Sequence, residues 1–289
     1  MTSYRLEEIF KISGVPTHTF VEPAEYNDLK VALRTAGRGV VVEGPSGIGK
    51  STAVAKAIAE VEAPLAVTKL SARVPADVEY IGLLPELSNF GLVIVDDFHK
   101  LQQELRDKLA DLLKTLADAE AVESKLVVVG INQAGYSLVQ HAPDLVNRID
   151  TVRFEAEPQH KLEELISLGE TALNIVIDNK AQIVEGSAGS FYLAQLLCHG
   201  ACVQAGVLEG REEITSVSTL YTTVRRNVMV RQDTRFAKPV KDFARGPHFR
   251  PSGRAPYLHI LRWLSESDSG SIDLRDEMGR HSTERISVS

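Results

Sequence analysis

The chain has 289 residues, of which 44% are hydrophobic and 25% charged, and its formal net charge is −7. These are ordinary values for a folded protein, and the length leaves room for about two domains. No apolar run approaches the roughly 20 residues that span a bilayer, and Met1–Glu8 lacks the apolar core of a signal peptide. The composition argues against an integral membrane protein and against a uniformly basic nucleic-acid coat, so we expect a cytoplasmic protein.

Strand patterns alternate with helix patterns through the first half of the chain. The predicted strands are Arg38–Glu43, Leu65–Leu70, Leu92–Asp96, Lys125–Gly130 and Thr151–Phe154. Several are apolar without alternation, as expected for strands covered on both faces. Leucines recur every three or four residues within Leu101–Ala119, which predicts an amphipathic helix. The pattern predicts an α/β fold, with a parallel five-stranded sheet between two layers of helices.

A glycine-rich loop follows the first predicted strand and precedes an alanine-rich helix. It fits the pattern G-x-x-x-x-G-K-[ST], in which backbone N–H groups surround phosphate oxygens and the helix N-terminus adds positive charge. Lys50 is expected to reach the β- and γ-phosphates, and the Ser51 hydroxyl to bind Mg²⁺. A plain turn between strand and helix is the alternative. The predicted nucleotide-binding residues are Gly44, Pro45, Ser46, Gly47, Ile48, Gly49, Lys50, Ser51 and Thr52.

Two carboxylates end the third predicted strand, where P-loop enzymes place an acidic group beside Mg²⁺. Asp96 is expected to hold the metal through water. Asp97 is expected to orient the attacking water and partly deprotonate it. The alternative for the pair is a turn, or a helix cap formed by Asp97.

Two further polar residues are candidates because they follow or precede strands of the same sheet. Asn132, after the fourth strand, is expected to contact the γ-phosphate or its water, and a turn-forming asparagine is the alternative. Arg148, directly before the fifth strand, suits planar phosphate recognition across a subunit boundary as an arginine finger. A structural salt bridge is the alternative for Arg148.

The second half of the chain reads mainly as helices. A small bundle is predicted from Gln159–Leu168, Leu173–Val184 and Ser190–Ala205, with Cys198 and Cys202 as small buried hydrophobes. A basic stretch over residues 225–254 is interpreted equally as a nucleic-acid or acidic-partner surface or as a solvated linker. Helices at 257–264 and 272–280, followed by 282–286, resemble part of a helix-turn-helix unit. We expect a fragment of a longer module, and Trp263 in its core.

This arrangement resembles the AAA+ superfamily, and within it the branch shared by Orc/Cdc6-type initiators and bacterial STAND-like NTPases. The resemblance rests on Gly44–Ser51 as Walker A, Leu92–Asp97 as Walker B, Asn132 as sensor 1, and Asn147 with Arg148 before the fifth strand. It covers residues 15–205 well and 255–289 loosely. The family has a P-loop NTPase three-layer sandwich, followed by a helical lid and a winged-helix module.

The resemblance also implies a division of the chain and a set of ligands. It predicts an NTPase domain over 1–156, a lid over 157–210, a basic connector over 211–254 and a partial winged-helix module over 255–289. The implied cofactors are ATP and Mg²⁺. The resemblance further implies that adenine packs against the segment that precedes the first helix, through Val15, Pro16 or Phe20; a plain core contact is the alternative for each.

Two departures from the family pattern favour slow turnover. The family carries Asp-Glu after the Walker B strand where this chain has Asp96-Asp97, and no arginine lies at the sensor 2 position of the helix that begins near Phe191. The leading hypothesis is therefore a slowly hydrolysing ATPase switch that homo-oligomerises, in a family with many roles in bacterial defence and signalling. A DNA-binding ATPase of initiator or transposition-regulator type, using residues 225–289, is the alternative. A scaffold that binds nucleotide without hydrolysing it is the third.

Overall fold

A computed structural model describes residues 4–61, 65–131, 138, 143–245, 256–267, 272–274 and 277 of the chain. Contacts between residues divide the chain into two compact units, Met1–Val224 and Arg225–Ser289. Within the described part of the chain, no helix combines the length and the apolar character that a membrane crossing requires.

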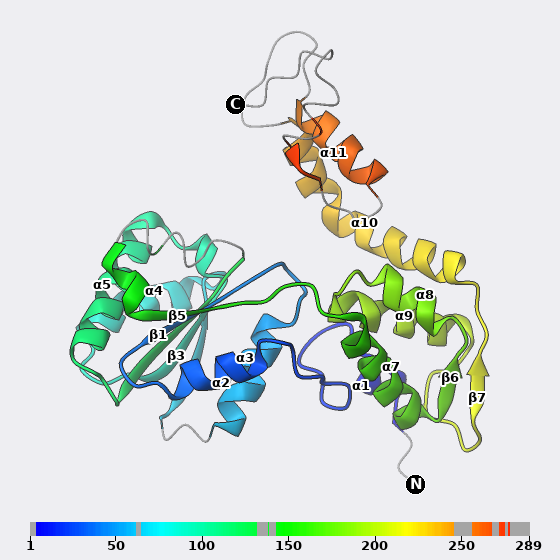
Figure 1. The fold of residues 1–289 in the computed structure, drawn as a ribbon, viewed down its shortest axis with the longest axis horizontal. Helices are drawn as coiled ribbons and strands as arrows, with labels where there is room; N and C mark the ends of the chain where they lie inside the picture. The colour runs from blue at the N-terminus through cyan, green and yellow to red at the C-terminus, as the bar shows by residue number, and fades with distance from the viewer. Residues whose placement is uncertain are drawn as a thin grey trace. The chain divides into compact units, whose positions relative to one another are not determined.

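A five-stranded sheet forms the centre of the first unit (Figure 1). Its order is β2-β3-β4-β1-β5, and every neighbouring pair is parallel. Each strand begins and ends within two residues of its predicted bounds, so the predicted α/β class and the parallel sheet are confirmed. The strands are β1 (Gly39–Glu43), β2 (Val67–Ser71), β3 (Gly91–Asp96), β4 (Ser124–Val129) and β5 (Ile149–Arg153).

Helices cover both faces of this sheet, with α2 and α3 on one side and α4 and α5 on the other (Figure 1). In β1, Val40 and Val42 pack in the core with α2 and α3, whereas Val41 packs in the core with α4 and α5. All three valines are fully buried, which explains why the strand shows no alternation in hydrophobicity. The helices are α2 (Tyr26–Arg34), α3 (Lys50–Glu60), α4 (Pro75–Leu83) and α5 (Gln103–Asp118).

A buried lysine links β4 to the C-terminal end of α2 through hydrogen bonds. Lys125 is 4% exposed, and its Nζ donates to the carbonyl oxygens of Ala32 at 2.7 Å and Thr35 at 2.5 Å. These carbonyls lie at the C-terminus of the helix, where backbone acceptors lack partners within the helix. Burial lowers the pKa of Lys125 to about 8. A charged residue inside an otherwise apolar strand therefore has a structural role.

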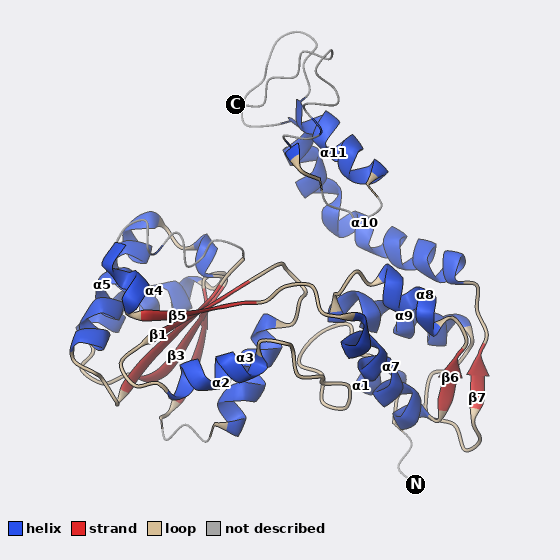
Figure 2. Cartoon of the chain, in the orientation of Figure 1, coloured by secondary structure: helices blue, strands red, loops and turns tan. Residues whose placement is uncertain are grey.

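A smaller body follows β5 and combines helices with a short sheet (Figure 2). The prediction of a helix over Leu173–Val184 was wrong in its first half. Asn174 adopts a left-handed conformation with φ 56° and ends α7, after which Ile175 and Ile177 point inward while Val176 is 48% exposed. The resulting strand pairs in parallel with β7. The elements are α7 (Gln159–Leu173), β6 (Ile175–Ile177), α8 (Lys180–Gly186), α9 (Phe191–Gln204) and β7 (Thr215–Val217).

Helix α9 places both cysteines in the core of this smaller body. Cys198 and Cys202 are free thiols and fully buried, which confirms their predicted role as small buried hydrophobes. Burial raises the pKa of Cys202 to about 12, so its thiol stays protonated at neutral pH.

The basic stretch contains a long helix that the sequence did not predict. Helix α10 covers Tyr221–Arg245 and continues through Pro239, the one proline within it. In the second unit, α11 (Pro256–Glu266) matches the predicted helix at 257–264, and Trp263 is 4% exposed, as expected for a core residue. The predicted elements at 272–280 and 282–286 lie mostly or entirely outside the described residues.

The remaining described elements are short. One α-helical turn, α1 (Leu6–Ile9), lies near the N-terminus, and its two ends are fully buried apolar side chains. Three 3₁₀ turns lie between sheet elements: η1 (Leu84–Glu86), η2 (Phe98–Lys100) and η3 (Pro143–Asn147).

Candidate nucleotide-binding site

A cavity of about 510 Å³ lies where the glycine-rich loop meets the tip of β3. Several parts of the first unit line it: the N-terminal segment between Lys11 and Pro23, the loop after β1, the segments that follow β2, β3 and β4, and helices α7 and α9. Ligands of open parallel α/β sheets bind at the carboxyl ends of the strands. The cavity therefore lies where the sequence places a nucleotide.

The glycines of the loop adopt conformations that other residues rarely take. Gly44, Gly47 and Gly49 have φ values of 148°, 83° and 104°. A Cβ at Gly44 would lie 2.4 Å from the carbonyl oxygen of Phe154, so backbone occupies the space that a side chain needs. Gly49 then starts α3 in the left-handed conformation. The loop is thus shaped to turn backbone N–H groups toward a bound anion.

Lys50 is the buried cation of this loop. It is 8% exposed, and its Nζ donates to the carbonyl oxygens of Gly44 and Pro45, each at 2.7 Å. Burial lowers the pKa of Lys50, and the negative charges of Asp96 and Asp97 oppose that shift. The ammonium group is therefore held at the loop by carbonyl acceptors that a phosphate can replace.

Ser51 and Asp96 meet, although 45 positions separate them along the chain. The Ser51 hydroxyl donates to Asp96 Oδ2 over 3.0 Å, and Lys69 Nζ lies 3.8 Å from the same oxygen. A hydroxyl oxygen and a carboxylate oxygen are hard ligands of the kind that Mg²⁺ binds. The donor set therefore fits the predicted metal.

Asp97 also lines the cavity, but its carboxylate is already paired with the guanidinium group of Arg73. Arg73 Nε donates to Oδ2 at 2.5 Å and Arg73 Nη2 to Oδ1 at 2.7 Å, which is a bidentate pair. Burial raises the pKa of Asp97, and the hydrogen bonds and charge of Arg73 outweigh burial, so the net pKa is lowered. Asp97 has a left-handed backbone conformation with φ 57°.

The other two residues predicted to be catalytic are Asn132 and Arg148, and neither is among the described residues that line the cavity. Asn132 lies outside the described residues; the neighbouring Gly130 and Ile131 line the cavity at the end of β4. Arg148 is not among the residues that line the cavity.

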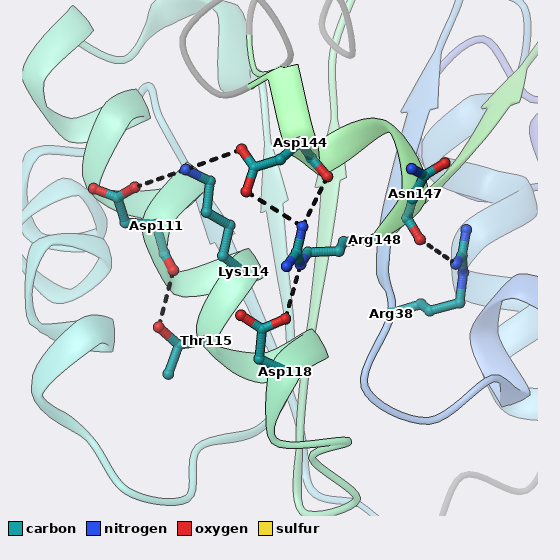
Figure 3. Close-up of polar contacts among 8 residues, drawn as sticks. All are labelled: Arg38, Asp111, Lys114, Thr115, Asp118, Asp144, Asn147 and Arg148. Carbon is teal, nitrogen blue, oxygen red and sulfur yellow. Dashed lines mark hydrogen bonds and ion pairs between the residues drawn. The ribbon is translucent and has the colours of Figure 1, made fainter.

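Arg148 lies in a group of charged side chains between α5 and η3 (Figure 3). Its Nε donates to Asp118 Oδ1 at 2.9 Å, and its Nη1 donates to the carbonyl oxygen of Asp144 at 3.1 Å and to Asp144 Oδ2 at 3.2 Å. Asp144 also pairs with Lys114 at 3.2 Å. The Arg148 side chain is still 31% exposed. Within one chain, Arg148 is thus a partly exposed, ion-paired residue.

Helix α9 and its N-cap contribute residues that no sequence motif identified. Ser190 caps α9, and its Oγ lies 3.4 Å from the carbonyl oxygen of Gly47. A Cβ at Gly49 would lie 3.6 Å from Phe191 Cδ2, so the start of α9 rests on the loop. Arg73, His99 and Gln195 also line the cavity. Of these, Arg73 follows β2, so the rule that carboxyl ends of parallel strands meet at one edge offered a signal for it.

The fold is similar to solved structures of two groups of proteins. Orc1 of Aeropyrum pernix, solved in complex with DNA, is 14% identical with a TM-score of 0.56, over 96% of this chain and 86% of that chain. The RuvB Holliday junction branch migration motor of Thermotoga maritima is 15% identical with a TM-score of 0.55, over 94% of this chain and 100% of that chain. Orc2 of Aeropyrum pernix, solved with ADPNP and ADP, is 16% identical with a TM-score of 0.52, over 92% and 90%.

No family model and no curated protein matches the chain. At these identities the structural similarity shows the fold alone. That fold is the AAA+ fold, as the resemblance in the motifs predicted.

Proposed function

We propose that the protein binds ATP together with Mg²⁺ and hydrolyses it slowly, as a switch that controls its own assembly or its contacts with a partner. One observation carries this proposal: Lys50, Ser51 and Asp96 converge on a single cavity whose loop glycines have left-handed φ values. The AAA+ fold supports it, because the similar Orc2 structure holds ADPNP and ADP.

In this proposal the chain's own residues divide the work. Backbone N–H groups of Gly44–Thr52 and the N-terminus of α3 bind the phosphates, and Lys50 turns from its loop carbonyls to the β- and γ-phosphates. Ser51 and Asp96 hold the metal ion, which neutralises charge on the phosphates. Asp97 orients the attacking water, and Asn132 contacts the γ-phosphate or that water. The Arg73–Asp97 pair must open or shift before Asp97 acts as a base, which favours slow turnover.

Arg148 provides a test of assembly. If it acts on the γ-phosphate of a neighbouring copy, ATP hydrolysis per chain must rise with protein concentration, and Arg148→Ala is expected to remove most of that rise while ATP affinity changes less than about threefold. Arginine fingers contribute large rate factors, so we expect a loss of at least about 100-fold at high protein concentration. Steady-state phosphate release, measured over a range of protein concentrations, checks this result.

Asp118→Ala is the matched control, because it breaks the ion pair that holds Arg148 within one chain (Figure 3). Both substitutions remove the pair between Arg148 and Asp118, and Arg148→Ala also removes the pair with Asp144, so a purely structural role predicts small effects of both on hydrolysis. The proposal requires a large loss for Arg148→Ala and a small one for Asp118→Ala. Equal effects, or specific activity that does not depend on concentration, would contradict it.

A second candidate function is DNA binding, and α10 favours it. Arg225, Arg226, Arg231, Lys238 and Lys241 are exposed on this helix, and the described acidic side chain among them is Asp242. Positively charged side chains clustered on one helix are suited to bind the phosphate backbone of DNA. The Orc1 neighbour was solved in complex with DNA.

Fluorescence anisotropy with labelled duplex DNA tests this candidate. We expect binding at low salt that weakens steeply as salt rises, because each neutralised phosphate releases counterions. Lys238→Ala with Lys241→Ala should reduce the slope of log K against log salt by about 1–2, whereas Lys108→Ala in α5, an exposed lysine of the other unit, should leave it unchanged. Absence of binding by the wild type at low salt eliminates the candidate.

A further inference from the structure

A buried amide on the lid helix α9 lines the candidate nucleotide cavity and has an unused acceptor. Gln195 is 4% exposed, and its Oε1 is buried with no hydrogen-bond partner in the described part of the chain. Buried polar atoms in folded proteins nearly always have a partner, so this oxygen calls for one. Gln195 belongs to none of the phosphate or metal motifs.

A chain of hydrogen bonds fixes which way the amide points. The Thr19 hydroxyl donates to the carbonyl oxygen of Ile9 at 2.9 Å, and Gln195 Nε2 lies 2.7 Å from Thr19 Oγ1. A hydroxyl has a single proton, and Ile9 takes it, so Thr19 Oγ1 can only accept from Gln195. The NH₂ group of Gln195 must therefore face Thr19, and Oε1 is the atom left over. Thr19 is 1% exposed, so water does not compete for this network.

Gln195 lies one helical turn along α9 from a residue beside the phosphate loop. Phe191 and Gln195 are one helical turn apart on the same face of the helix. Phe191 lies next to the phosphate loop at Gly49, so Gln195 lies one turn farther from it. Pro16, Phe20 and Leu165 also line the cavity and offer apolar surface. A flat ring attached to a bound triphosphate would therefore meet apolar walls and one buried acceptor.

We propose that Gln195 Oε1 accepts a hydrogen bond from the 6-amino group of adenine and is the atom that selects ATP over 6-oxopurine nucleotides. This inference rests on the proposed nucleotide site. Adenine carries a donor at C6, whereas guanine carries the acceptor O6. An oxygen facing an oxygen leaves two buried acceptors unpaired, and a site built for a hydrogen bond rejects such a ligand strongly. Thr19 is the positioning residue, because it prevents the amide from turning its NH₂ group toward O6.

Calorimetric titration with three triphosphates tests the contact at C6. Purine riboside triphosphate lacks only the 6-amino group of ATP, whereas inosine triphosphate has an oxygen at C6 and a proton on N1. We expect the wild type to bind ATP about 10- to 100-fold more tightly than either analogue. In Gln195→Leu the ratio should fall to within about threefold. Gln204→Leu, an exposed glutamine at the end of the same helix, should keep the wild-type ratio.

The outcomes separate this inference from the proposed function. If the wild type binds none of the triphosphates, the nucleotide site itself is wrong. If the wild type binds ATP and Gln195→Leu keeps the same ATP preference, only the assignment of Gln195 is overturned. Equal binding of ATP and purine riboside triphosphate by the wild type would also overturn it.

Thr19 variants test the positioning role through the ratio of inosine triphosphate affinity to ATP affinity, which a general loss of stability does not change. Thr19→Val removes the acceptor that holds the amide, so Gln195 can turn and donate to O6. We expect tighter binding of inosine triphosphate relative to ATP by about tenfold, whereas Thr19→Ser, which keeps the hydroxyl, should retain wild-type selectivity. Full discrimination against inosine triphosphate in Thr19→Val would show that Thr19 does not hold the amide. Thermal unfolding confirms that each variant is folded at the titration temperature.

Discussion

Lys50→Ala is expected to abolish ATP binding, with affinity reduced by at least about 100-fold. The ammonium group is held at the mouth of the loop by two carbonyl oxygens at 2.7 Å, so it is positioned to transfer to phosphate oxygens without crossing the cavity. Each charge-assisted hydrogen bond to a phosphate contributes on the order of 1.5–3 kcal/mol, and Lys50 is expected to make two. Calorimetric titration of ATP with Mg²⁺ measures the loss.

The controls separate lost binding from lost structure. Lys50→Ala leaves the Gly44 and Pro45 carbonyls without their donor, so the free energy of unfolding is expected to fall by about 1–2 kcal/mol. Lys108→Ala removes a lysine of α5 that forms an exposed ion pair with Glu104, and this variant should bind ATP as the wild type does. A folded Lys50→Ala protein with wild-type affinity would refute the nucleotide site.

The main sheet could be predicted because burial on both faces leaves a mark in each strand. The valines of β1 face two different helix layers, so the strand reads as an unbroken apolar run. The small sheet of β6 and β7 could not be predicted. Strand β6 is only three residues long, and its alternation of buried and exposed side chains is too short to distinguish it from the helices on either side. Helix α10 was missed for a different reason: the prolines, glycines and basic side chains favoured a linker or a binding surface, whereas the 25 residues from Tyr221 to Arg245 form one helix.

The candidate site was predictable where one local motif or one strand end defines a residue. The glycine pattern identified Gly44–Ser51, and the end of an apolar strand identified Asp96. Arg73 lies just after β2, so a strand end offered a signal for it as well. Gln195 reaches the same cavity from α9, through a tertiary contact that no local spacing encodes. The hydrogen bond between Gln195 and Thr19 joins positions 176 residues apart. For Arg148 the limit is in the structure of a single chain, because the phosphate that it is proposed to contact is bound to another copy of the chain.

Asp97→Asn is expected to lower the rate of ATP hydrolysis by about 10²- to 10⁴-fold, the usual range for removing a general base. Asparagine has nearly the same shape, so the phosphate loop and the ligands Ser51 and Asp96 should be undisturbed, and ATP affinity should change less than about threefold. Single-turnover hydrolysis with saturating enzyme measures the chemical step. Unchanged hydrolysis in Asp97→Asn would assign the base to another group.

Arg73→Ala tests whether the guanidinium group restrains Asp97. Burial raises the pKa of the Asp97 carboxyl, and at present the hydrogen bonds and charge of Arg73 outweigh burial and lower it. Hydrolysis by this route requires ionised Asp97, so the rate falls as pH falls through that pKa. Without Arg73 the effect of burial dominates, and the acid limb of the profile of kcat against pH is expected to move to higher pH.

The plateau rate of the pH profile shows whether Arg73 restrains Asp97 or instead contacts the phosphates. Above the acid limb, Arg73→Ala should hydrolyse ATP at least as fast as the wild type, because the carboxylate no longer has to leave a bidentate pair. Arg34→Ala, which removes an exposed arginine of α2, should leave both the limb and the plateau unchanged. A plateau lowered more than about tenfold with an unmoved acid limb would mean that Arg73 acts on the phosphates. In that case the slow turnover would have to come from the shorter Asp97 side chain itself.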